Sequence, residues 1–341
     1  MDNQHFLRGV VYRQYTRFGS AKTGFDSRLP ENIELKFFDT LTMHNKLREI
    51  ERVFNINEIL ALRTDDEYVT RYYRINKIPY SVFHTNSDLI YMGISRDGVY
   101  KEDDLLEAAR TISSYIPALK ATDVLELATG RGANSLYLAQ KYPGVNFWGI
   151  DISMGQLDYA LRKSKTVSNY FPSYGDYHDL SRYASASQDI VFEVEALCYS
   201  KNPKIVLNEV WRVLRPGGMF ILFDGYRTAA NLEENDNIIC TIVEHGMAVD
   251  KFQIYTNFKQ DALDVGFVLE HEENVSGYVL PTMRRFEHLA QRFFAFPKIA
   301  KLATYLLPKE FLYNAISGYL MPDIMEKRLA IYMITIFTNP K

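Results

Sequence analysis

The sequence predicts an α/β protein built on a doubly wound sheet, and two observations carry this prediction. Short apolar runs of strand length follow one another after Thr122, and segments of helical periodicity separate them. Parallel strands that are buried on both faces read as continuous apolar runs, and their connections are usually helices. The four clearest runs are residues 124–127, 145–150, 189–194 and 219–223.

The remaining elements follow from the same periodicities. Crossover helices are expected at 133–141, 154–165 and 203–214, and a further short helix and strand at 260–265 and 266–275. The apolar run 331–337 predicts a last strand. Upstream, amphipathic helices are expected within 31–62 and 101–119, so that residues 1–117 form a helical extension that covers the site.

A long helical segment at about 283–328 separates the last two strands, and it exceeds an ordinary connection. It is predicted to be a lid or substrate-binding insertion. Its aromatic residues are interrupted by lysines, so it lacks a spanning stretch of ~20 apolar residues. Packing on the α/β domain is the simplest expectation, but contact with a membrane surface through 293–320 stays open.

Composition excludes several classes of protein. The 341 residues include 39 Lys and Arg against 42 Asp and Glu, and this net charge of −3 disfavours nucleic-acid binding. Cys198 and Cys240 are far apart and lack zinc-site spacing. No metal is expected, and the N-terminal residues do not form a signal peptide, so we expect a cytoplasmic protein. Assembly into a homo-oligomer stays open.

Small residues follow the first strand at the point where the chain must turn into a helix. Ala128, Gly130 and Gly132 allow a ligand to approach main-chain N–H groups, although their spacing is not that of the dinucleotide fingerprint. Asp151 ends the second strand, where a carboxylate can accept hydrogen bonds from both hydroxyls of a ribose. Asp176, in a later loop, is expected to reach an adenine amino group. Together these residues predict a bound nucleoside.

With Glu126, these residues and the run Leu-Arg-Pro-Gly-Gly-Met-Phe at 214–220, the chain resembles class I S-adenosylmethionine-dependent methyltransferases over about 119–275 plus the final strand. The resemblance implies a seven-stranded, Rossmann-like sheet that the antiparallel strand at 331–337 completes. It also implies S-adenosyl-L-methionine as cofactor, an S-adenosylmethionine-binding domain at 118–282, and residues 329–341 as the last part of that domain. Ala128 replaces the usual first glycine of the loop.

A narrower resemblance lies in Asp-Ile-Val-Phe-Glu-Val-Glu-Ala-Leu-Cys-Tyr at 189–199, which looks like the fourth-strand motif of sterol C-methyltransferases and their tocopherol and quinone relatives. Residues 80–84 and 91–93 look like the aromatic entry segment of that group and of cyclopropane fatty acid synthases. This resemblance implies C-methylation of a lipophilic small molecule, such as an isoprenoid, sterol-like or prenylated aromatic compound. An O- or N-methyltransferase and a catalytically silent binding module remain alternatives, whereas the glycine spacing disfavours a nicotinamide dehydrogenase.

The candidate site residues follow from these motifs. Methyl transfer to an alkene or aromatic carbon develops positive charge, which aromatic faces can stabilise and which a carboxylate or imidazole can relieve by removing a proton. Glu195 is the first candidate for that role, with His84 and Tyr199 behind it. Alternatively, Glu195 is a structural carboxylate, and Glu126 and Asp151 are helix caps. The predicted cofactor contacts are Tyr80, Glu126, Ala128, Gly130, Gly132, Asp151, Ile152, Gln156, Asp176, Tyr177 and Glu193.

Overall fold

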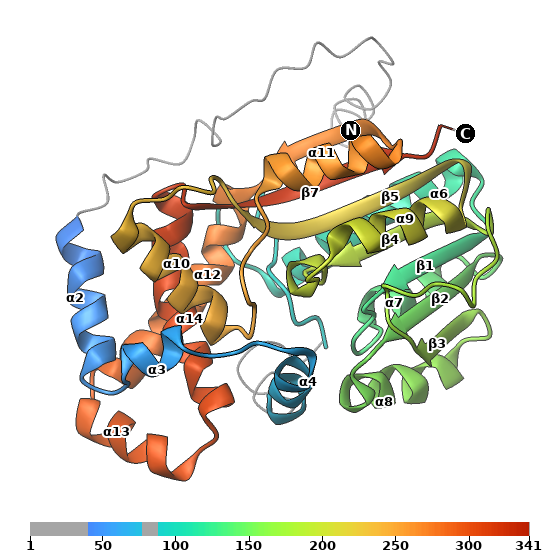
Figure 1. Ribbon diagram of the computed structural model, residues 1–341. Helices are drawn as coiled ribbons and strands as arrows, with labels where there is room; N and C mark the ends of the chain where they lie inside the picture. Colours follow the sequence, from blue (N-terminus) through green and yellow to red (C-terminus); the bar gives the residue numbers. More distant parts are fainter. Residues whose placement is uncertain (1–39, 77–87, 341) are drawn as a thin grey trace, which may run out of the picture.

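The computed structural model describes residues 40–76 and 88–340, and it contains a seven-stranded sheet flanked by helices (Figure 1). The strand order is β3-β2-β1-β4-β5-β7-β6. The first five strands in this order are parallel, and β7 is antiparallel to both of its neighbours. The predicted doubly wound, seven-stranded fold is therefore confirmed. The strands are β1 Asp123–Leu127, β2 Asn146–Asp151, β3 Tyr170–Tyr174, β4 Gln188–Val194, β5 Leu214–Arg227, β6 Val268–Asn274 and β7 Ala330–Thr338.

Helices cover both faces of the sheet because alternate strand residues enter two different cores. Val124 of β1 belongs to a core shared with the helices α6 Glu107–Leu119 and α7 Ala133–Lys141. Its neighbour Leu125 belongs to a second core. That second core includes residues of α9 Pro203–Val213 and α11 Tyr255–Val265. The central strands β1 and β4 are mostly apolar because both of their faces are covered, whereas the edge strands β3 and β6 are partly exposed.

Three helices follow β6 before the chain returns as β7: α12 Ser276–Phe294, α13 Pro297–Leu306 and α14 Lys309–Glu326. They lie beside α10 Glu234–Gly246, at the end of the sheet where α2 Thr40–Glu51 and α3 Ile56–Leu60 also pack (Figure 1). Helix α4 Asp66–Ile75 contacts both α14 and α8 Met154–Lys163. Helix α4 thereby connects the α/β part of the chain, through α8, to the inserted helices.

The structure departs from the sequence prediction at several elements. Strand β3 and helix α4 were not predicted, β5 is longer at both ends than 219–223, and α11 begins before residue 260. The helical insertion starts at Ser276, earlier than the predicted residue 283. Among the residues that the structure describes, no helix is both long and apolar enough to cross a bilayer.

Candidate functional site

A cavity of about 650 Å³ opens at the carboxyl ends of β1, β2, β4 and β5 and continues between the inserted helices. One end contains the loop after β1 and the acid that ends β2. The other end is lined by apolar side chains of α12, α13 and α14, among them Phe286, Phe293 and Phe311. The cavity therefore joins a polar end, which contains the loop after β1 and Asp151, to an apolar chamber.

The loop after β1 turns through left-handed backbone conformations at three positions. The φ angles are 50° at Ala128, 55° at Gly130 and 73° at Gly132. A Cβ atom at Gly132 would lie 2.4 Å from the Tyr170 hydroxyl, so glycine is required there for close packing as well as for the turn. Ala128 adopts the conformation that a glycine would adopt more easily.

Asp151 connects this loop to the start of α8. Its Oδ2 accepts a hydrogen bond of 2.8 Å from the Gly130 N–H, and its Oδ1 accepts one of 2.7 Å from the Ser153 N–H. Asp151 also lines the cavity, so the capping role and the place in the site occur together. Burial raises the pKa of Asp151 to about 6. Beside it, the buried Ser153 hydroxyl also lines the cavity and has no hydrogen-bond partner among the described residues.

Glu126 binds both the loop and the first residues of α7. Its carboxylate accepts hydrogen bonds from the hydroxyls of Thr129 at 2.6 Å and Ser135 at 2.5 Å, and from the Asn134 amide at 3.2 Å. Burial raises its pKa to about 7. Glu126 therefore fixes the loop to the beginning of α7 and at the same time forms part of the cavity wall.

The structure brings most of the predicted cofactor residues into the cavity wall. They are Glu126, Ala128, Gly130, Asp151, Ile152, Gln156 and Tyr177. Gly132 belongs to the loop but does not line the cavity, and Glu193 is fully buried, where its carboxylate accepts the N–H groups of Ala196 and Leu197. Tyr80 and His84 lie outside the described residues.

Asp176 was predicted to reach an adenine amino group, but its side chain does not line the cavity. It is 54% exposed, and its Oδ1 accepts hydrogen bonds from the backbone N–H of His178 and contacts the His178 ring. The next residue, Tyr177, lines the cavity and donates a hydrogen bond of 3.3 Å to the Ala196 carbonyl. The Asp176 carboxylate thus closes a local turn beside the cavity, and its contact with an adenine amino group stays a prediction.

Glu195 lines the cavity and directly follows β4. It has a φ of 53°, an uncommon conformation for a residue with a side chain. Its Oε1 accepts hydrogen bonds from the Met92 N–H at 2.6 Å and from the Tyr332 hydroxyl at 2.9 Å. Burial raises the pKa of Glu195 to about 7. Tyr199 also lines the cavity and donates to the Met247 carbonyl at 3.1 Å.

Several cavity residues were not predicted from the sequence. Asp224 in β5 lines the cavity, and its carboxylate accepts the N–H groups of Cys198 and Gly225 at 2.8 and 2.7 Å. Burial raises its pKa to about 7. An acid directly after the apolar run 219–223 was a signal that could have identified it, since the carboxyl ends of parallel strands share one edge.

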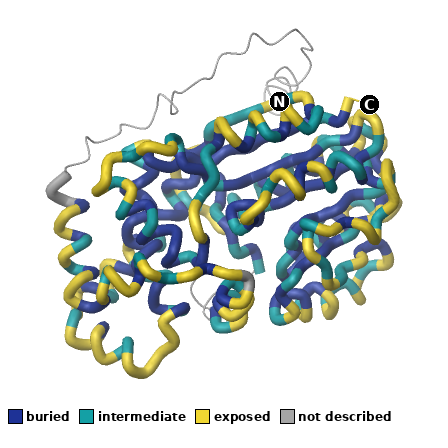
Figure 2. The backbone as a smooth tube through the Cα atoms, in the orientation of Figure 1, coloured by how far each residue is buried: buried dark blue, intermediate teal, exposed yellow. Residues whose placement is uncertain are grey.

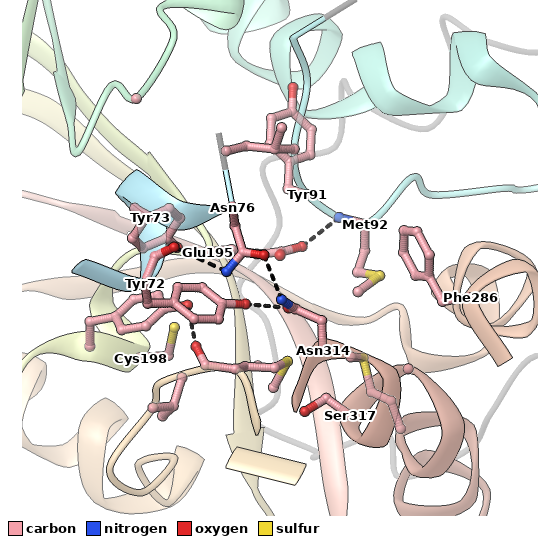
Figure 3. Close-up of a pocket in the computed structure, with 18 of the residues that line it drawn as sticks. Tyr72, Tyr73, Asn76, Tyr91, Met92, Glu195, Cys198, Phe286, Asn314 and Ser317 are labelled. Carbon is pink, nitrogen blue, oxygen red and sulfur yellow. Dashed lines mark hydrogen bonds between the residues drawn. The ribbon is translucent and has the colours of Figure 1, made fainter. Parts of the chain in front are cut away.

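A polar network from α4 and α14 also lines the cavity (Figure 3). The Tyr72 hydroxyl donates to Asn314 Oδ1 at 2.5 Å, and Asn314 Nδ2 donates to Asn76 Oδ1 at 2.9 Å. Figure 3 shows Tyr91 and Met92 beside Glu195, with Asn314 and Ser317 on the facing helix. No sequence pattern connects these residues, because they come from separate helices.

Sequence comparison identifies relatives in the region of the first five strands. A family model described as a methyltransferase domain matches residues 125–222. Sterol methyltransferase-like 3 of Botryococcus braunii is 32% identical over 117 residues, which are 33% of this chain and 29% of that protein. The malonyl-acyl-carrier-protein O-methyltransferase of Hahella chejuensis is 28% identical over 161 residues, which are 42% of this chain and 57% of that protein. The chain thus spans less than two thirds of the length of these relatives.

Solved structures share the fold over most of the chain. The cyclase SpnF superimposes with a TM-score of 0.64 at 16% identity, covering 80% of this chain and 96% of that one. The geranyl diphosphate C-methyltransferase of Streptomyces coelicolor A3(2) superimposes with a TM-score of 0.56 at 12% identity, covering 82% and 99%. Residues 125–222 of this chain therefore match a methyltransferase-domain family, and the chain shares its fold with a methyltransferase of known structure.

Proposed function

We propose that this protein uses S-adenosyl-L-methionine to methylate a carbon atom of a lipophilic small molecule, of the isoprenoid, sterol-like or prenylated aromatic class. The observation that carries the proposal is the cavity, whose lining combines Glu195 with the polar residues around Asp151 and with the apolar side chains of the inserted helices. Helices α12, α13 and α14 serve as the substrate cover. The free thiols Cys198 and Cys240 are compatible with the cytoplasmic location that the sequence predicts.

The residues at the polar end fit S-adenosylmethionine. Each oxygen of Asp151 accepts one backbone hydrogen bond, and a carboxylate oxygen can accept more than one, so capacity remains for ribose hydroxyls. The Ser153 hydroxyl is buried without a partner among the described residues, and a polar ligand group would satisfy it. When bound, S-adenosylmethionine supplies an electrophilic methyl group on a sulfonium centre.

Glu195 is suited to removing a proton from the methylated carbon. The Met92 N–H and the Tyr332 hydroxyl both bind Oε1 and hold the carboxylate in one orientation. With a pKa of about 7, a substantial fraction of Glu195 is ionised at neutral pH and able to accept the proton. The rings of Tyr91, Tyr199 and Tyr332 also line the cavity, where aromatic faces stabilise positive charge on the substrate.

O-methylation is the second candidate, and the relative that methylates malonyl-acyl-carrier protein at oxygen favours it. A carboxylic acid that is already ionised needs no base, so Glu195 would have no role in that reaction. Replacing Glu195 by Gln therefore separates the two candidates: turnover falls strongly if a carbon must lose a proton, and it is preserved if the acceptor is an ionised oxygen.

Isothermal titration of the full chain with S-adenosylmethionine and S-adenosylhomocysteine tests the cofactor, with NADH as the negative control. We expect micromolar binding of both sulfur nucleosides. Asp151→Ala should weaken binding by roughly 1 to 3 kcal/mol, as expected for lost charge-assisted hydrogen bonds, whereas Asp261→Ala, which changes an exposed acid outside the cavity, is the matched control and should not. Unchanged affinity in Asp151→Ala would remove that residue from the site, and absence of binding by the native chain would overturn the proposed function.

The product tests the acceptor atom. Lipid extract incubated with the protein and a ¹³C-methyl donor should give a methyl carbon with the chemical shift of a C–CH₃ group. A methoxy or N-methyl signal would instead support the alternative chemistry, and tight cofactor binding with no labelled product from any lipid fraction would favour a silent binding module.

A further inference from the structure

Helix α13 exposes an unusual concentration of apolar side chains. Of the fourteen large apolar side chains that are exposed in the described structure, six lie within residues 296–307, with exposed fractions between 44% and 77%. Ala300 is the only residue of α13 that is buried. In Figures 1 and 2, α13 lies at the edge of the molecule farthest from the sheet, and its surface is largely exposed. The six residues are Phe296, Ile299, Leu302, Tyr305, Leu306 and Leu307, which we name the α13 patch.

The charged side chains of the segment that carries the α13 patch are all basic, and the acidic group beside them is Glu58 of α3, which is close to Lys301 and Lys309. No Asp or Glu occurs in the chain between Glu287 and Glu310, whereas Arg292, Lys298 and Lys301 lie within this stretch and are exposed. Glu287 and Glu310 themselves are buried. Lys309 is the exception in the segment, since it pairs with Glu58 of α3 at 2.7 Å. Apolar residues accompanied by cations match the interfacial region of an anionic bilayer better than they match bulk water.

The α13 patch is continuous with the cavity. Phe296, Ile299 and Leu307 are exposed on the surface and also line the cavity, as do the half-buried Ala303 and Phe311 behind them. An apolar molecule that crosses this edge would therefore pass from the surface to the chamber next to Glu195 without leaving an apolar environment. Large exposed apolar patches of this kind mark interaction sites on soluble proteins.

We propose that α13 docks on the surface of an anionic membrane and that the cavity takes its apolar substrate directly from the bilayer. The docking depends only on the α13 patch and its cations. The second part, entry of a substrate for methylation, rests on the proposed function above. The protein would lie on the membrane rather than span it, because α13 has only 10 residues.

Flotation of the full chain with vesicles tests the docking. We expect binding to phosphatidylcholine vesicles with about 30 mol % phosphatidylglycerol and weaker binding to phosphatidylcholine alone, because the anionic lipid attracts the cations. The double variant Leu302→Glu with Leu306→Glu should lose at least about tenfold in partition coefficient. Neither residue lines the cavity. The matched control, Val99→Glu with Ile205→Glu, changes two exposed apolar residues elsewhere and should bind as the native chain does.

Transfer of parinaric acid, a fluorescent fatty acid, from vesicles to the protein tests the entry route. The α13 double variant should slow this transfer, whereas its equilibrium binding of parinaric acid added without vesicles should match that of the native chain. Equal vesicle binding by the native chain and the α13 variant would overturn the proposal. So would a native dimer, detected by light scattering, that the α13 variant converts to monomer while vesicle binding is absent.

These measurements separate the two proposals. Vesicle binding and parinaric acid transfer need neither cofactor nor turnover, so loss of both in the α13 variant would support the docking even if S-adenosylmethionine did not bind. Conversely, normal cofactor binding with no vesicle binding would leave the proposed function intact and remove the docking.

Discussion

At the scale of single residues, Ala128 has a backbone conformation in the loop after β1 that glycine adopts more easily. An L-residue in the left-handed region costs about 1 to 2 kcal/mol, and the Ala128 φ of 50° lies in that region. We expect Ala128→Gly to raise the free energy of unfolding by roughly 1 kcal/mol while retaining cofactor affinity. Urea unfolding measures the change. Ala139→Gly in α7 is the control and should lower the free energy of unfolding. If both variants changed the free energy of unfolding in the same direction, the explanation would be contradicted.

The hydrogen bond from the Tyr332 hydroxyl to Glu195 predicts how turnover depends on pH. Glu195 can accept a proton only when ionised, so the rate should rise with pH through about 7. The Tyr332 hydroxyl stabilises the ionised carboxylate and thereby lowers its pKa. In Tyr332→Phe the rising limb of the kcat profile should therefore move to higher pH. In Tyr199→Phe its position should stay unchanged, because that hydroxyl binds the Met247 carbonyl instead. An unmoved limb in Tyr332→Phe would show that another group titrates.

The acids at the site were predictable where they follow a strand directly. Glu126, Asp151 and Glu195 lie at strand ends that the apolar runs mark, and parallel strands place such ends at one edge. Asp176 lies in a loop, where its carboxylate accepts the N–H group two residues away, and its contact with the cofactor stays a prediction. Asn76 and Asn314 could not be predicted, since their pairing depends on how α4 packs against α14.

At the scale of elements, strand β3 lacks the pattern on which prediction depends, whereas helix α4 has this pattern. Strand β3 reads Tyr-Phe-Pro-Ser-Tyr, and a proline together with partial exposure conceals a short strand that pairs only with β2. Helix α4 does have an N-cap, because Asp65 accepts the Tyr68 N–H. Its residues also follow an amphipathic helical pattern, so this helix could have been predicted from the sequence.

A buried lysine, Lys46, links helix α2 to helices α12 and α14 of the substrate cover. Lys46 Nζ lies 2.5 Å from Glu287 of α12 and 2.6 Å from Asp323 of α14. Lys46→Ala would leave both carboxylates without this cation, so we expect a loss of roughly 3 to 5 kcal/mol in urea unfolding. Lys204→Ala, which removes an exposed contact to Asp261, should change stability by less than about 1 kcal/mol. Similar effects for both lysines would argue against a role for burial.

At the scale of the whole molecule, buried carboxyl groups at the cavity govern stability against pH. Their native pKa values lie above the ordinary ones, so the native state binds more protons than the unfolded state between about pH 4.5 and 7. Stability should therefore fall as pH rises through this range, and the melting temperature should be higher at about pH 6 than at about pH 8. The groups are Glu126, Asp151, Glu195 and Asp224, with values from about 6 to about 7.

Glu193 is a further buried acid with a raised pKa, next to Asp224, and a variant of it tests whether buried acids cause this pH dependence. Burial and the neighbouring Asp224 raise its pKa, and its Oε1 has no hydrogen-bond partner among the described residues. Glu193→Gln keeps an oxygen for the Ala196 and Leu197 N–H groups and removes one titrating group. The fall in melting temperature with pH should then be smaller than in the native chain. A fall of the same size would exclude Glu193 as a contributor.

The position of β7 also constrains the order in which the molecule can assemble. Strand β6 joins the sheet only through β7, which lies between it and β5, and the three inserted helices separate β6 from β7 in the chain. During synthesis on the ribosome, β6 and the substrate cover must therefore wait for residues 330–338 before their sheet partner exists. The five parallel strands can associate earlier, because each already has a neighbour. Closure of the substrate chamber is thus expected to be a late folding step.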